Sequence, residues 1–123
     1  MTETSARDII EHGMAEDLLI APVANDLLSW SLEWSVTYCE PTSNSALRID
    51  LEGALALGRL TLWSSGNAYL EVLRNTYGAQ FICANIIVNS DREAVGALKV
   101  LAAAVAQLPS NNSFNPMPLR GTG

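Results

Sequence analysis

The chain has 123 residues, of which 49% are hydrophobic and 16% charged, a composition that suits one globular domain and excludes a disordered chain. Its formal net charge of −6 argues against nucleic acid or an anionic membrane as the partner, because both attract a basic surface. The same charge suits either a basic protein partner or simple solubility.

Two cysteines, Cys39 and Cys83, lie far apart in the sequence and form no CxxC motif, so no disulfide framework is predicted. The N-terminus has neither the basic start nor the apolar run of a secretory signal. No segment reaches the length of a membrane span. We therefore expect a cytoplasmic protein with reduced thiols.

The first 21 residues allow two interpretations. Residues 5–12 can form a short helix that ends at Gly13, or the segment can be a loosely packed arm. The sequence leaves this choice open.

A helix is predicted over residues 22–32. Pro22 suits a first helical position. The helical spacing is carried by Val23, Leu27 and Trp30. We expect Trp30 and Trp34, which flank the junction with the first strand, to pack in the core.

Alternation of apolar and polar residues then predicts an antiparallel meander of four or five strands. The alternating segments are residues 34–39, 46–52, 59–63, 68–73 and 79–88, separated by turns at 40–44, 64–67 and 75–78. We expect Asp50 to lie opposite Arg59 and form an ion pair with it.

The hairpin at residues 60–72 has its inward side chains at even positions on both strands, so facing residues must sum to an even number. This parity requires a loop of odd length. We predict the loop at residues 65–67, with Leu62 opposite Leu70 and Trp63 opposite Tyr69.

A C-terminal helix begins at the capping box formed by Ser90 and Glu93 and ends at Pro109. We expect the small residues Gly96, Ala97, Ala103 and Ala104 to let this helix approach the sheet closely. The fold class is therefore α+β, a single domain over residues 1–109 with terminal helices packed on one sheet face. Residues 110–123 are predicted to be a flexible tail.

Strand alternation places six candidate partner-binding residues on the sheet face away from the helices: Asp50, Glu52, Arg59, Trp63, Tyr69 and Glu71. Tryptophan and tyrosine amid charged residues are typical of a protein-binding hot spot. The alternative is that the two rings stabilise the hairpin or lie beneath the N-terminal segment.

Catalysis and metal binding have little support in the sequence. His12 is the single histidine, neither cysteine has a basic neighbour, and no phosphate-binding loop is present. Asp50 and Glu52 lie two residues apart, but the nearby arginines favour their ionised forms. We predict no catalytic, cofactor-binding or metal-binding residues.

The run Gly58-Arg-Leu-Thr-Leu-Trp-Ser-Ser-Gly66, followed by Leu70-Glu-Val72, resembles the core motif of the TriTu family of bacterial immunity proteins. Ser64 stands where that family commonly has an acidic residue. The order of the flanking elements extends the resemblance over residues 22–108.

The resemblance implies a protein that is not an enzyme and takes no cofactor. It would neutralise a cognate Rhs-type polymorphic toxin, a basic ADP-ribosyltransferase that uses NAD and modifies elongation factor Tu. The implied mechanism is occlusion of the NAD cleft by an acidic surface, with the protein a monomer or weak dimer. Two alternatives remain: an acidic chaperone for a secreted effector, or a small-ligand-binding domain with its pocket between sheet and helices.

Overall fold

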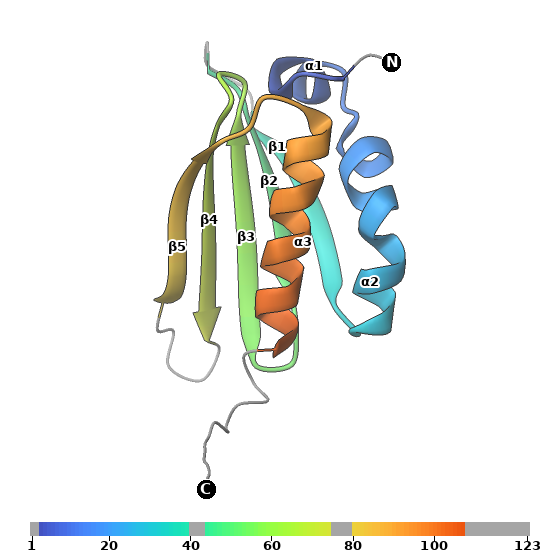
Figure 1. Cartoon of the computed structure of the whole chain (residues 1–123), viewed down its shortest axis with the longest axis vertical. Coiled ribbons are helices and arrows are strands. Elements are labelled where there is room, and N and C mark those ends of the chain that lie inside the picture. Colours follow the sequence, from blue (N-terminus) through green and yellow to red (C-terminus); the bar gives the residue numbers. More distant parts are fainter. Residues whose placement is uncertain (1–2, 40–43, 75–79, 108–123) are drawn as a thin grey trace, which may run out of the picture.

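The computed structural model describes residues 3–39, 44–74 and 80–107. Five antiparallel strands form one sheet in which each strand neighbours the next along the chain (Figure 1). The strands are β1 (Glu33–Cys39), β2 (Ala46–Glu52), β3 (Ala56–Trp63), β4 (Asn67–Arg74) and β5 (Gln80–Ile87). The predicted α+β class and the meander are thereby confirmed.

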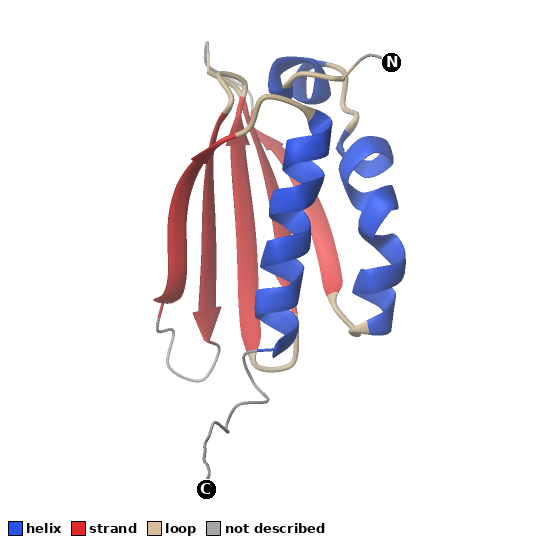
Figure 2. Cartoon of the chain, viewed as in Figure 1, coloured by secondary structure: helices blue, strands red, loops and turns tan. Residues whose placement is uncertain are grey.

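Helices cover one face of this sheet and leave the other open (Figure 2). They are α1 (Ala6–Glu11), the turns η1 (Glu16–Ile20) and η2 (Ala21–Val23), α2 (Ala24–Ser29) and α3 (Asp91–Gln107). The long helix α3 packs on β3, β4 and β2 and also contacts η1 and η2. The core lies between α3, the N-terminal helices and the inward residues of the strands.

The N-terminal segment packs into this core. The Oγ of Ser5 accepts a hydrogen bond from the backbone N–H of Asp8 at 3.2 Å and caps α1, and Ile9 is fully buried. Gly13 has a φ of +61°, so it ends the helix in the left-handed region. Of the two interpretations that the sequence left open, the structure has the short helix.

The predicted limits of the second helix are wrong, because helical turns begin earlier than Pro22 and end at Ser29. Proline has no N–H and cannot continue the ordinary helical ladder, so the hydrogen bonding changes around Pro22. A π-turn precedes it and a short 3-10 turn contains it. Ser31, with a φ of +57°, follows the helix end and turns the chain into β1.

The expectation that Trp30 and Trp34 pack in the core is also wrong. Their side chains are 39% and 44% exposed. Trp34 lies on β1, the edge strand, where only one neighbouring strand flanks it. Leu27 and Leu32 are buried in this region instead.

The capping box of α3 is confirmed, with one difference. The backbone N–H of Glu93 donates to Ser90 Oγ at 3.3 Å, while the Glu93 carboxylate accepts from Asn89, one residue before the cap, at 2.8 Å. The predicted end of this helix at Pro109 and the predicted tail lie outside the described residues, as do the turns at 40–43 and 75–78.

The close approach of helix and sheet does not depend on Gly96, which has no atom within 4 Å of an added Cβ. It depends on Gly58 of β3. A Cβ built there would lie 2.5 Å from Val105 Cγ2 of α3. The glycine that allows the close approach therefore lies in the sheet and not in the helix.

The predicted hairpin register is wrong by two residues, although its parity is right. Leu62 pairs with Ala68, and Thr61 pairs with Tyr69. The loop therefore spans residues 64–66, with Gly66 last at a φ of +98° and its N–H donating to Trp63 O at 2.9 Å. A three-residue hairpin loop requires the left-handed residue at its third position, which only glycine occupies easily.

Candidate partner-binding surface

The open face of the sheet can be mapped from the strand registers. Gly58 faces α3, so residues of its parity point to the helices and the alternate residues point away. The open-face residues form an acidic row (Glu33, Glu52, Leu57, Leu73), a central row (Ser35, Asp50, Arg59, Glu71, Cys83), a tyrosine row (Thr37, Arg48, Thr61, Tyr69, Asn85) and a tryptophan row (Cys39, Ala46, Trp63). Successive rows are about 7 Å apart, two residues along each strand.

All six residues singled out from the sequence lie in these four rows, but they do not form one cluster. Asp50, Glu52, Arg59 and Glu71 line a hollow of about 400 Å³. Trp63 lies two rows, or about 14 Å, from Arg59. Because Tyr69 pairs with Thr61, it lies diagonal to Trp63 and not opposite it.

The hollow combines acidic and apolar side chains. Four carboxylates and one guanidinium line it, which corresponds to a formal charge of −3. The lining also includes Glu33, Trp34, Leu57 and Leu73, none of which the sequence reasoning selected. Extending the alternation of the first strand back by one residue would have found Glu33. Leu57 and Leu73 show no polar signal and emerge only from the register.

The centre of the hollow is a network of ion pairs around Asp50. Arg59 Nε donates to Asp50 Oδ1 at 2.7 Å, as the predicted cross-strand pair requires, and Arg48 Nε lies 3.5 Å from Asp50 Oδ2. The hydrogen bond to Asp50, with the negative charges of Asp50 and Glu71, raises the pKa of Arg59 above its usual value. The side chains are 43% and 31% exposed, so the Arg59–Asp50 pair contributes about 0–1 kcal/mol.

The acidic row contains an uncompensated pair of like charges. Glu33 and Glu52 lie directly opposite each other on β1 and β2. Within the described residues, neither forms an ion pair with a cation. Like charges in this arrangement destabilise a sheet. Arg48 and Arg59, the arginines that strand parity places on the open face, are both engaged by Asp50.

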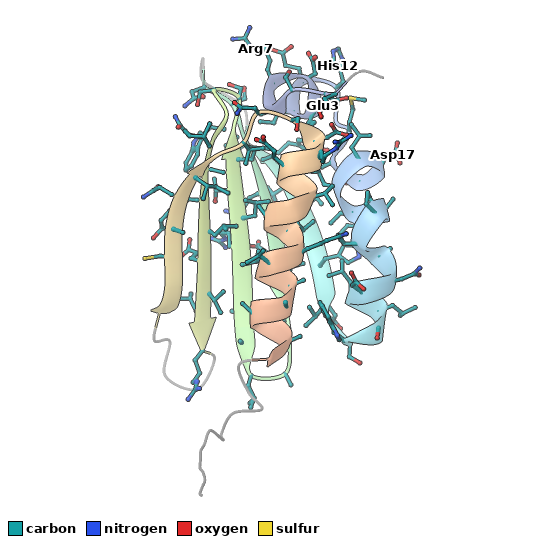
Figure 3. All side chains as sticks on the ribbon, in the orientation of Figure 1. Glu3, Arg7, His12 and Asp17 are labelled. Atoms are coloured by element: carbon teal, nitrogen blue, oxygen red, sulfur yellow. The ribbon has the colours of Figure 1, made fainter. Side chains whose placement is uncertain are left out.

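The opposite end of the molecule carries a different set of charged groups. Figure 3 shows Arg7 and His12 on and beside α1, with Glu3 nearby. Potential metal-ligating atoms of Asp8, Glu11 and His12 lie within 4.8 Å of one another, but all three residues are exposed, and exposed acidic groups are commonly grouped without an ion. Among the helices of the described ranges, none combines the length and apolar character needed to cross a membrane.

A sheet covered on one side and presenting a charged, partly apolar hollow on the other has the architecture of a protein-binding module. The family comparison makes this class specific. Residues 20–103 match the family model described as Immunity protein TriTu, and the chain belongs to this family. Membership supports an immunity function exerted on a cognate toxin. No curated protein and no solved structure shows significant similarity to the chain.

Proposed function

We propose that this protein neutralises its cognate toxin by binding it through the open face of the sheet, without catalysis and in a one-to-one complex. The observation that carries this proposal is the hollow, where two rows of the open face bring four carboxylates together beside exposed apolar side chains. The proposed contacts are Asp50, Glu52, Arg59, Trp63, Tyr69 and Glu71. Of these, Asp50 is already held by two arginines and serves to orient Arg59.

The proposed toxin is a basic ADP-ribosyltransferase, encountered in the cytoplasm of the cell that makes both proteins. NAD carries a negatively charged pyrophosphate, so a cleft that binds it presents positive groups. An acidic face can occupy such a cleft and exclude NAD. The net charge of −6 would also speed the encounter with a basic toxin.

Affinity capture from the source bacterium tests the proposal, with the purified protein as bait at low and at moderate salt. We expect recovery of one stoichiometric basic toxin domain, whose ADP-ribosylation of elongation factor Tu stops at equimolar immunity protein. Raising NAD should restore part of the activity, because NAD and the immunity protein would compete. Retention of no protein at low salt would contradict immunity, and recovery of many unfolded effectors would favour the chaperone alternative.

Two variants locate the contact. Glu52→Lys reverses a charge in the hollow and should abolish inhibition. Glu11→Lys makes the same charge change on α1, at the opposite end of the molecule, and should leave inhibition nearly intact. Equal loss in both variants would show that net charge, and not the open face, determines binding.

A further inference from the structure

We propose that the hollow receives a single arginine side chain of the toxin, whose guanidinium lies between Glu33 and Glu52. This inference rests on the proposed immunity function and specifies its central contact. It starts from the order of side chains along the acidic row, which runs from Leu73 and Leu57 to Glu52 and Glu33 across four adjacent strands.

The acidic row matches the chemistry of an arginine laid across it. Arginine has an apolar stem and a cationic end. Leu57, which is 39% exposed, can cover the stem, and the two glutamates lie one and two strands further, about 5 and 10 Å away. The row therefore presents apolar and then acidic surface at the spacing that a long side chain requires.

The glutamate pair explains why the guest is a cation that comes from outside the chain. Glu33 and Glu52 repel each other, and both nearby arginines point to Asp50 in the next row, at 3.5 and 2.7 Å. The Arg59–Asp50 pair also keeps Arg59 from collapsing onto the glutamates. An incoming positive charge would relieve the repulsion that the free protein retains.

Two adjacent carboxylates favour arginine over lysine. A guanidinium is planar and donates several N–H groups in a fixed fork, so it can bridge both glutamates at once. An ammonium is a compact and strongly hydrated charge that gains less from such a site. Leu55, which is 45% exposed, follows β2 at the same end of the sheet and can form part of a rim that excludes water.

The proposal predicts opposite effects on the free protein and on the complex. Glu33→Gln and Glu52→Gln each remove the repulsion without changing shape, so each should raise the melting temperature of the free protein. Each should also weaken toxin binding by about tenfold or more, as expected for loss of a buried charge partner. Glu11→Gln, the matched control on α1, should change the dissociation constant by less than about twofold.

Isothermal titration with the captured toxin domain measures these constants, and arginine-to-glutamine variants of the toxin identify the guest. One such variant should lose affinity against the wild-type protein but not against Glu52→Gln. The proposal is overturned, with immunity intact, if the hollow variants bind like Glu11→Gln or if no toxin arginine couples to Glu52.

If the wild-type protein does not bind the toxin, the proposed function fails and the hollow is tested alone. N-acetyl-arginine amide is titrated into isotope-labelled protein, with the uncharged citrulline analogue as the control. Saturable amide shifts at Glu33 and Glu52 with arginine only would support the site. Absence of saturable shifts, or equal shifts with citrulline, would overturn it.

Discussion

At the scale of single residues, the contact between Gly58 and α3 sets how closely the helix lies on the sheet. A Cβ at this position would lie 2.5 Å from Val105 Cγ2 and 3.1 Å from Leu101 Cδ1. Both neighbours are buried, and the β-branched Val105 has few alternative rotamers. The core therefore has no room for even one methyl group.

Gly58→Ala should lower the free energy of unfolding by about 1–3 kcal/mol, the usual cost of overpacking, as measured by urea denaturation. Gly96→Ala is the matched control, because nothing lies within 4 Å of the added methyl group on an exposed helix position. It should raise stability by about 0.5–1 kcal/mol, since alanine favours the helix. Effects of the same sign in both variants would refute this account of the helix–sheet contact.

The sequence indicated a close approach of helix and sheet but assigned it to the wrong glycine. Gly96 lies in the helix itself, whereas Gly58 acquires its role only when β3 and α3 are packed together. Trp30 and Trp34 show the same limitation. Their size favours burial, but the position of β1 at the sheet edge, which no local pattern reveals, leaves them exposed.

At the scale of elements, Tyr38 joins β1 to the N-terminal helical turns. Its hydroxyl accepts from the backbone N–H of Ala15 at 3.1 Å and donates to Glu16 Oε1 at 3.2 Å. Ala15 is fully buried, so its N–H would lose its partner without this hydroxyl. Tyr38→Phe should lower the free energy of unfolding by about 1–2 kcal/mol at neutral pH.

The same contact makes stability depend on alkaline pH. Burial, followed by the negative charge of Glu16, raises the pKa of Tyr38 above 10.0, while the bond from Ala15 opposes this shift. The folded state then holds the proton more tightly than the unfolded state. The Tyr38 contribution is complete below pH 10 and is lost as the pH rises through the folded-state pKa. In Tyr38→Phe, the free energy of unfolding measured by urea denaturation should therefore fall less above pH 10 than it does in the wild-type protein. An identical dependence on pH in the two proteins would contradict this role of Tyr38.

Element type and order followed from the sequence, while exact register did not. Alternation identified the strands, and Ala46–Glu52 has the predicted limits. The hairpin loop was misplaced by one position because both placements satisfy the even sum, and only the left-handed geometry of Gly66 selects between them. Pro22 was taken as a helix start, although the chain passes through it by changing its hydrogen-bond pattern.

At the scale of the whole molecule, parity correctly predicted which side chains share the open face, but not which of them meet. Trp63 and Glu52 have the same parity, yet they lie three rows, or about 20 Å, apart. The hollow depends on registers across four strands, which place Glu33 and Leu57 beside Glu52. Pairing across strands is a property of the assembled sheet and leaves no local trace in any one strand.

Net charge acts at this largest scale, and it should control the speed of toxin binding. The chain carries −6, and a basic partner is attracted from beyond contact distance only while salt does not screen the charges. Between about 0.01 M and 1 M salt the screening length falls from about 30 to about 3 Å, so the association rate constant should fall by about tenfold or more. Stopped-flow fluorescence with the toxin domain measures this rate.

The variant Glu52→Gln should mainly accelerate dissociation, because a contact in the hollow is made after the encounter. An association rate constant that does not depend on salt would mean that the acidic charge serves solubility alone, since steering is the step that salt removes.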